Sequence, residues 1–173
     1  ELPKAAIIIG AGAIGVEFGY IWHHYGVDVT IVEMLPRVVP LEDEEISKEL
    51  ARAFRKLKIK VRTDSKVTHL QTDENGARVT IAGPDGATET LTAGEVLVSI
   101  GVQPNSDGIG LEALGVRTER GYIVIDDKMR TNVPGIYAVG DVTGKVMLAH
   151  VAQAQGIVAT ESIAGVKTVV LDY

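Results

Sequence analysis

A glycine-rich turn between an apolar segment and a helix constrains this chain more than any other feature. The continuous apolar run at residues 5–9 is typical of a strand buried on both faces of a parallel sheet. The turn Gly10-Ala11-Gly12-Ala13-Ile14-Gly15 follows it at once, and a helix is predicted over 13–25. A second strand over 27–33 completes a strand–helix–strand unit of about 30 residues. The apolar residues whose spacing predicts the helix are Ile14, Phe18, Ile21, Trp22 and Tyr25.

Each glycine of this turn has its own physical reason. Gly10 makes the tight strand-to-helix turn, Gly12 lets the backbone approach a pyrophosphate, and Gly15 lets the helix pack closely on the strand. The pyrophosphate then lies at the helix N-terminus, where free N–H groups and the helix dipole attract it. The intervening residues Ala11, Ala13 and Ile14 belong to the same predicted binding turn.

The second predicted strand ends in an acidic residue, Glu33. A carboxylate about 20 residues after such a turn accepts hydrogen bonds from the adenosine ribose. It repels a 2′-phosphate, so NAD is favoured over NADP. A glycine pattern alone is weak evidence, but here the strand, helix, second strand and acid are all present. The alternative is a structural glycine turn with a surface glutamate. Because FAD is bound by the same pattern, the turn alone does not choose between the two cofactors.

The rest of the chain divides into two regions. The first predicts a helix over 43–57 and a short strand over 59–62. The strands predicted over 66–71, 77–82 and 88–92 form an antiparallel meander, and a further strand over 95–100 is predicted to be buried. The second predicts a helical turn within 105–115, strands over 121–125 and 135–141, and a helix over 148–164.

Composition narrows the functional classes. The chain is 46% hydrophobic and 23% charged, as in ordinary globular domains, and its net charge of −6 argues against nucleic-acid binding. Its apolar runs are too short to span a membrane. The absence of cysteine excludes disulfides, thiolate metal sites and a cysteine nucleophile within the chain, and the four histidines form no metal-ligand pattern.

Three further segments carry a specific resemblance. The turn extends to Glu17, and it is followed in order by Ser-Ile-Gly-Val-Gln-Pro-Asn at 99–105, Arg-Thr-Asn-Val-Pro-Gly-Ile-Tyr-Ala-Val-Gly-Asp at 130–141 and Met-Leu-Ala-His at 147–150. Together these segments resemble the dihydrolipoamide dehydrogenases of the pyridine nucleotide–disulfide oxidoreductase family, and the resemblance covers the whole chain. One departure is Val102-Gln103, where the family often has an arginine.

The resemblance implies an α/β fold in two parts. Residues 1–104 would form an NAD-binding Rossmann-type domain, a parallel sheet with an inserted antiparallel β-meander. Residues 105–173 would form the second segment of an FAD-binding domain, a flavin-domain-like strand and helix tail. In the longer enzyme this tail packs on the rest of the flavin domain. Without that cover, we expect it to fold back on the first domain or to mediate a homo-oligomer. The apolar residues expected to lose cover are Ile136, Tyr137, Val139, Val151, Ile157, Val158 and Ile163.

The resemblance also assigns site residues. For NAD it implies Glu17 near the nicotinamide, Val67 at the adenine and Gly101 approached by the nucleotide. For FAD it implies Asp141 at the ribityl chain and residues 147–150 beside the flavin ring, where a helix N-terminus can stabilise charge. The flavin-ring residues are Met147, Leu148, Ala149 and His150. Alternatively, Glu17 is an exposed dipole-complementing glutamate, Asp141 a turn aspartate, and Val67 and Gly101 ordinary strand and turn residues.

The implied longer protein is an FAD- and NAD-dependent enzyme, a homodimer within a 2-oxo acid dehydrogenase complex of the cytoplasm or, in a eukaryote, the mitochondrial matrix. It requires a redox-active cysteine pair, an FAD fingerprint and a histidine–glutamate base, and this chain has no cysteine and one fingerprint. We therefore expect no catalytic residue, no metal and no lipoamide turnover in this chain, which would be an internal piece. The alternatives are a glutathione or mercuric reductase, an NADH oxidase, or a self-standing NAD-binding module.

Overall fold

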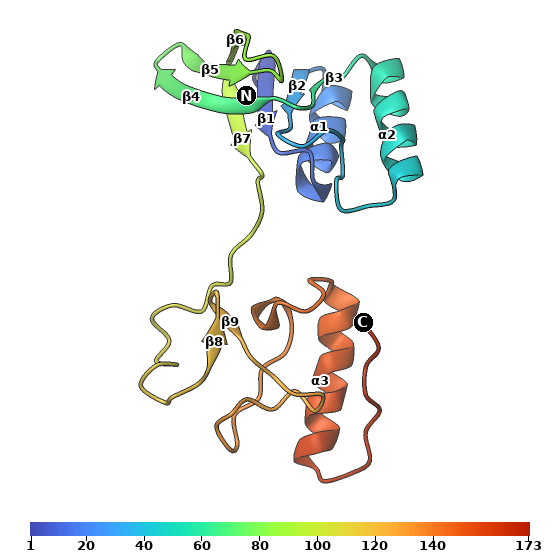
Figure 1. Cartoon of the computed structure of the whole chain (residues 1–173), viewed down its shortest axis with the longest axis vertical. Helices are drawn as coiled ribbons and strands as arrows, with labels where there is room; N and C mark the ends of the chain where they lie inside the picture. The colour runs from blue at the N-terminus through green and yellow to red at the C-terminus, as the bar shows by residue number, and fades with distance from the viewer. The chain divides into compact units, whose positions relative to one another are not determined.

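The computed structural model describes residues 1–173 as two compact units, Glu1–Val102 and Gln103–Tyr173. Each unit has its own hydrophobic clusters. Figure 1 labels the helices and strands of both units and colours them along the chain. The α/β fold class expected from the sequence is confirmed. None of the helices is long and apolar enough to cross a membrane.

The first unit is built on a four-stranded parallel sheet in the order β3-β2-β1-β7. Helix α1 joins β1 to β2, and α2 joins β2 to β3, so the predicted strand–helix–strand unit is confirmed. The carboxyl ends of β1 and β2 therefore lie side by side, with Ile9 opposite Val32. The elements are β1 (Ala5–Ile9), α1 (Ala13–His24), β2 (Asp28–Val32), α2 (Glu44–Leu57), β3 (Lys60–Arg62) and β7 (Glu95–Val98).

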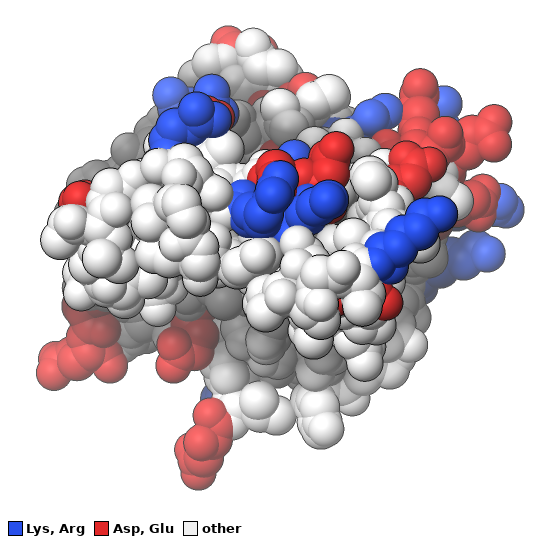
Figure 2. Space-filling view, turned by 90° about the horizontal axis from the view of Figure 1, so that it is seen from below, with Lys and Arg blue, Asp and Glu red and all other residues white.

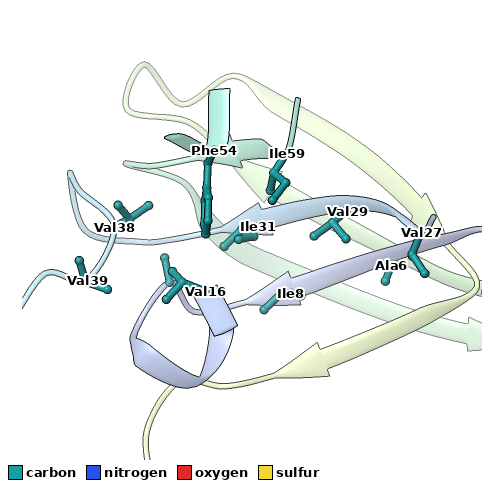
Figure 3. Packing of buried hydrophobic residues seen from close by; sticks show 11 residues of the cluster. Ala6, Ile8, Val16, Val27, Val29, Ile31, Val38, Val39, Phe54 and Ile59 are labelled. Atoms are coloured by element: carbon teal, nitrogen blue, oxygen red, sulfur yellow. The ribbon is translucent and has the colours of Figure 1, made fainter. Parts of the chain in front are cut away.

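The main core of this unit lies between the sheet and its helices (Figure 3). Ile8 and Ile31 contribute from adjacent strands, and Phe54 reaches in from α2. Helix α2 begins at a capped end, because Asp43 accepts a hydrogen bond from the amide of Glu45 at 2.8 Å.

Helix α1 packs on the sheet through its smallest residues. Its buried residues are Gly15, Val16 and Gly19, and a Cβ at Gly19 would lie 2.8 Å from the side chain of Ile31. Of the apolar residues whose spacing predicted the helix, only Trp22 packs against this core, and the others are exposed, Ile14, for example, by 44%. Helix α1 comes closest to the sheet at its glycines, which have no side chain. The spacing of hydrophobic residues does not predict such a contact.

The predicted antiparallel meander is present, and it packs on the other face of the sheet. Val79 and Ile81 of its central strand cluster with Ile7 and Val32. The meander strands are β4 (Lys66–Asp73), β5 (Gly76–Ala82) and β6 (Thr88–Ala93).

The last strand of the first unit corrects one prediction. The apolar run over 95–100 was expected to be a buried strand, but β7 ends at Val98 and lies at the edge of the sheet. Val98 is 57% exposed and Ile100 is 76% exposed. A strand at an edge has one neighbour, so apolar composition does not by itself bury it.

The second unit contains a short hairpin and one long helix. Its elements are β8 (Thr118–Glu119), β9 (Tyr122–Ile123), a 3₁₀ turn η1 (Asp141–Thr143) and α3 (Ala149–Ile163). The predicted helix over 148–164 is confirmed. The predicted strand over 121–125 is reduced to the two residues of β9.

One other predicted element of this unit, the strand over 135–141, is wrong. Residues 135–141 form no strand and make one isolated bridge, between Arg130 and Tyr137, because a ladder needs a partner strand. The helical turn predicted within 105–115 is present as one turn, in which the Leu114 amide donates to the Gly110 carbonyl at 3.3 Å. It does not continue into a helix, and Gly110 and Gly115 on either side have positive φ.

The apolar residues expected to lose cover are only partly exposed. Ile157 and Ile163 are 59% and 65% exposed, and Val139 is 39% exposed. Val158 was expected to be exposed, but it is buried against Met129. The unit therefore forms small clusters of its own. On the face shown in Figure 2, acidic and basic side chains are interspersed between broad uncharged stretches.

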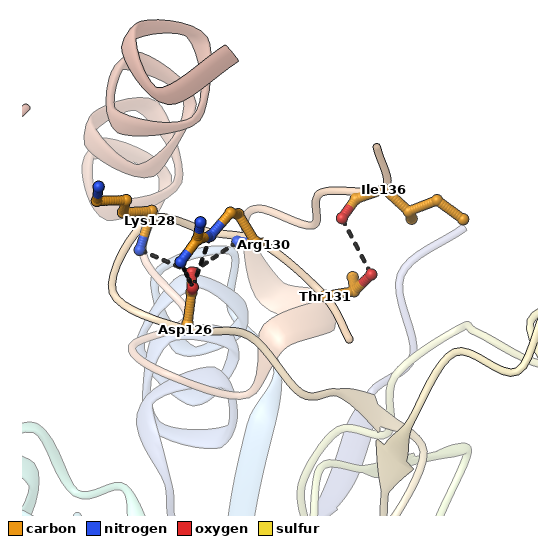
Figure 4. Close-up of polar contacts among 5 residues, drawn as sticks. All are labelled: Asp126, Lys128, Arg130, Thr131 and Ile136. Atoms are coloured by element: carbon orange, nitrogen blue, oxygen red, sulfur yellow. Dashed lines mark hydrogen bonds and ion pairs between the residues drawn. The ribbon is translucent and has the colours of Figure 1, made fainter. Parts of the chain in front are cut away.

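A charged turn organises the loop before Tyr137 (Figure 4). Asp126 accepts hydrogen bonds from the amides of Lys128 and Arg130, both at 2.9 Å, and pairs with the Arg130 guanidinium at 2.6 Å. Burial raises the pKa of Asp126, but the hydrogen bonds and charge of Arg130 and the Lys128 amide outweigh it and leave the pKa below 3.8.

The lowered pKa predicts how this turn responds to acid. A carboxyl whose pKa is lower when folded stabilises the fold above its unfolded pKa, and loses that effect as the pH falls through the folded pKa. We expect the Arg130 Nε–H resonance to titrate with a midpoint below 3.8, the ordinary aspartate value. In Asp126→Asn this transition should disappear. A midpoint at or above the ordinary value would contradict the assignment.

Candidate dinucleotide-binding site

The N-terminus of α1 is left open. Its N-cap residue, Gly12, has no side chain to cap the helix, whereas α2 is capped by Asp43. The first amide with an acceptor inside the helix is that of Val16, which donates to the Gly12 carbonyl at 3.0 Å. The amides of residues 12–15 therefore project without an acceptor in the chain. Such a group of free N–H donors, at the positive end of the helix dipole, can bind an anion.

Gly10 and Gly15 are required by the fold itself. Gly10 has φ +104°, and a Cβ there would overlap the carbonyl of Ser99. A Cβ at Gly15 would overlap the carbonyl oxygen of Gly10 and lie 2.8 Å from the Ser99 hydroxyl. The reasons predicted for these two glycines, a tight turn and close packing, agree with this geometry.

Gly12 is different, because neither its backbone nor its neighbours require glycine. Its φ of −70° and ψ of −177° suit any residue, and a Cβ would meet no atom within 4 Å. A side chain at Gly12 would instead extend into the open space before the free amides. Apart from the modest preference of a helix N-cap for glycine over alanine, the missing Cβ matters to a group that approaches from outside, and a pyrophosphate fits this position.

Glu33 is buried beside the turn and is not a surface glutamate. It is 9% exposed, and its Oε2 accepts a hydrogen bond from the Ala11 amide at 2.7 Å. Its Oε1 accepts another from the Leu35 amide at 2.9 Å. Each carboxylate oxygen has a further lone pair, so the group can still accept from a hydroxyl. Glu33 therefore also positions the glycine turn, a role that sequence reasoning missed.

Ser99 is a second residue that sequence reasoning missed. Its hydroxyl lies 3.1 Å from the carbonyl oxygens of both Ile9 and Gly10, to which it donates, and its amide donates to Ile9 at 2.8 Å. It thereby joins the end of β7 to the start of the turn. The only sequence signal was its place in the Ser-Ile-Gly segment, which gave no structural reason.

The other residues predicted for NAD lie apart from these hydrogen bonds. Glu17 is exposed on α1 and lines an apolar groove between α1 and α2 with Tyr20 and Phe54. Val67 is half-buried and packs on the meander core. Gly101 follows β7 with φ +134°, a conformation that favours glycine. No hydrogen bond within the chain joins any of the three to the turn.

The second unit has an open helix N-terminus of its own. Leu148 occupies the N-cap position of α3, and its side chain makes no capping hydrogen bond. The amides of Ala149 and His150 have no acceptor in the chain. The residues predicted for FAD beside it are exposed, with Met147 at 44% and Leu148 at 48%. An anionic or electron-rich group can therefore approach this helix end.

Asp141 is held near α3 by a residue that sequence reasoning missed. Gln155 of α3 is 1% exposed, and its Oε1 accepts a hydrogen bond from the Gly140 amide at 2.6 Å. Its Nε2 donates to the Tyr173 hydroxyl at 2.8 Å. This buried amide fixes the Gly140–Asp141 turn against the helix and leaves the Asp141 side chain exposed.

Comparison with known proteins identifies the family of this chain. The family described as pyridine nucleotide-disulphide oxidoreductase matches residues 1–156, so the chain belongs to that family. Dihydrolipoyl dehydrogenase of Mycobacterium leprae is 54% identical over the whole chain, and that of Corynebacterium glutamicum is 53% identical over 99% of it. The chain spans 37% of the length of each relative.

Solved structures give the same fold. The crystal structure of LpdA from Mycobacterium tuberculosis matches 99% of the chain with a TM-score of 0.89 and 32% identity, and the chain covers 37% of it. The HOCl-induced flavoprotein disulfide reductase RclA from Escherichia coli matches 98% of the chain with a TM-score of 0.88 and 27% identity, and the chain covers 38% of it.

Proposed function

We propose that this chain is the NAD-binding part of a dihydrolipoyl dehydrogenase, joined to a segment that completes the FAD site of the whole enzyme. The single observation that supports NAD binding most directly is Gly12, whose missing Cβ serves neither the backbone nor the packing. The high identity to dihydrolipoyl dehydrogenases favours this enzyme over other disulfide reductases, an NADH oxidase or a self-standing module.

The residues of the chain would then divide the work of binding. The free amides at 12–15 would hold the pyrophosphate, and Glu33 would accept from the adenosine ribose while excluding a 2′-phosphate. Glu17, Val67 and Gly101 remain proposed contacts of the same nucleotide. The bound nicotinamide supplies hydride chemistry, to which these residues contribute position and electrostatics.

In the second unit, the α3 N-terminus would face the flavin of the whole enzyme. Asp141 would bind the ribityl chain, and residues 147–150 would lie at the flavin ring. The open amides at the start of α3 would stabilise negative charge there. A homodimeric enzyme within a 2-oxo acid dehydrogenase complex, cytoplasmic or mitochondrial, and self-association of this chain remain proposals.

In our proposal, the oxidation of the dithiol substrate is carried out by another part of the enzyme. Exchange with a dithiol requires a cysteine thiolate, and the chain contains no cysteine. The chain alone is therefore expected to bind NADH and to show no dihydrolipoamide oxidation.

Isothermal titration of the purified chain with NADH, NADPH and FAD tests this function. We expect NADH to bind at least about 10-fold more tightly than NADPH, which corresponds to about 1.4 kcal/mol. We also expect no dihydrolipoamide-dependent reduction of NAD. Preference for FAD over NADH, or equal affinity for NADH and NADPH, would contradict the nucleotide assignment. Turnover by the chain alone would contradict the assignment of the thiol chemistry to another part of the enzyme.

A further inference from the structure

A second cavity of the first unit lies apart from the glycine turn. It has a volume of about 550 Å³ and is formed by α2, β3 and the segment at 36–38. This volume is within the range of roughly 300–1,000 Å³ that is typical of small-molecule sites. None of residues 10–15 lines it, and neither does Glu33. The proposed dinucleotide site therefore does not account for it.

The cavity has an apolar floor. Val38 is 1% exposed and Ile59 is 4% exposed, and the half-buried Ala51 and Val61 lie beside them. The helix residues that line the cavity form one face of α2, because each has another lining residue three or four positions away. They are Glu44, Ser47, Lys48, Ala51 and Arg55. Because β3 is an edge strand, no further strand covers this side of the sheet.

Cationic side chains surround this floor. Arg37, Lys48 and Arg55 line the cavity, and Glu44 is the only acidic residue that does so. Lys48 pairs with Glu44 at 2.7 Å, whereas Arg55 makes no ion pair or side-chain hydrogen bond in the chain. The hydrogen bond and charge of Lys48, with the charge of Arg37, hold the pKa of Glu44 below its usual value. The cavity thus keeps an excess of positive charge in a chain whose net charge is −6.

Arg37 is held in place at the cavity. One terminal nitrogen of its guanidinium donates to the carbonyl oxygens of Pro40 at 3.0 Å and Glu42 at 3.3 Å. Its other N–H groups make no hydrogen bond within the chain. A guanidinium fixed in this way loses little freedom when it binds a carboxylate or phosphate.

We propose that this cavity is a second ligand site, which binds a small organic anion. The apolar body of the ligand lies on the floor at Ala51 and Val61, and its carboxylate or phosphate contacts Arg55 and Arg37. Apolar contacts bury most of the ligand's surface, and the two guanidinium groups favour a negatively charged ligand over a neutral one. The site is independent of NAD binding, so the two can be tested separately.

Two-dimensional NMR of the ¹⁵N-labelled chain tests the site with phenyl phosphate as the probe. We expect saturable shifts at the backbone amides of Ala51, Arg55 and Thr63, and no such shifts with the neutral benzyl alcohol. Benzoate in a parallel titration shows whether the site prefers a carboxylate or a phosphate. Arg55→Gln is expected to weaken binding about 10-fold, since it removes a charged hydrogen-bond donor.

Two further variants make the result specific. Arg52→Gln is the matched control, because Arg52 lies on the same helix but does not line the cavity and pairs with Glu49 at 3.5 Å. It should leave the affinity unchanged. Ala51→Leu retains every charge but fills the floor, and it should abolish the shifts.

Several outcomes would overturn the proposal. Equal affinity in Arg55→Gln and the unchanged chain would do so, as would equal losses in Arg55→Gln and Arg52→Gln. Equal shifts with benzyl alcohol would contradict the selection for an anion. Shifts confined to residues 10–15 would show that the probe binds at the glycine turn instead. NADH titration of the same samples keeps these results separate from a failure of the proposed function.

Discussion

Alanine in place of Gly15 is expected to destabilise the first unit by about 3 kcal/mol, because the packed structure leaves no space for the new Cβ. It would overlap the Gly10 carbonyl, a backbone atom that cannot rotate away as a flexible side chain could. Relief requires α1 to move from the sheet or the turn to deform. Urea unfolding followed by fluorescence of Trp22 measures this effect. Trp22 is the only tryptophan, and it packs against the core of this unit.

Gly12→Ala is the matched comparison, and its expected result is the reverse. No atom lies within 4 Å of the added Cβ, so the unfolding free energy should change by no more than about 1 kcal/mol, the cost of alanine at an N-cap. NADH affinity should fall at least about 10-fold, because the methyl group occupies the approach to the free amides.

This pair of variants separates fold from function within one turn. Gly15→Ala should lower the unfolding midpoint, and Gly12→Ala should lower the affinity with little change in the midpoint. If Gly12→Ala bound NADH normally, the proposed pyrophosphate position would be wrong. If Gly15→Ala were as stable as the unchanged chain, the tight helix–strand contact would be wrong.

Glu33→Gln is expected to cost about 2 kcal/mol of stability and to weaken NADH binding as well. The carboxylate accepts from two amides, those of Ala11 and Leu35. A glutamine side chain has one acceptor oxygen, which can accept from one of the two amides, and its NH₂ group, itself a donor, would face the other amide. One buried N–H then loses its acceptor, and the turn loses a contact that positions it. Discrimination against NADPH should fall too, because the negative charge is gone.

The control for this change is Glu49→Gln on α2. Glu49 is exposed and contacts Arg52 at 3.5 Å, a surface pair of little expected energetic value. The same Trp22 unfolding measurement and the NADH and NADPH titrations apply to both variants. If Glu33→Gln left stability unchanged, the carboxylate would not position the turn. If it left the NADH-to-NADPH preference unchanged, Glu33 would not set cofactor choice.

Much of the fold could be predicted from local pattern. The apolar run of β1, the glycine turn and helix α2 all depend on residues near one another in sequence. Backbone conformation and hydrophobic periodicity act over such short distances, so the sequence carries them directly. The same reasoning separated the meander from the parallel strands.

The wrong predictions have a common physical origin. Residues 135–141 have the composition of a strand but find one bridging partner, and β7 is apolar but lies at an edge. A segment forms a β-strand only when a neighbouring strand accepts and donates its backbone hydrogen bonds, and a strand is buried only when other elements cover its sheet. Neither property is local, so composition alone did not predict them.

The sequence by itself determined the strand–helix–strand unit, the glycine turn and the acidic residue that follows it. The tertiary structure alone decided which atoms enforce these roles, the Gly10 carbonyl against a Cβ at Gly15 and the Glu33 carboxylate on the Ala11 amide. It also brought Arg37 and Arg55 to one cavity. The reason is physical. A motif specifies backbone shape over a few residues, whereas a contact depends on which distant atoms the completed packing brings within reach.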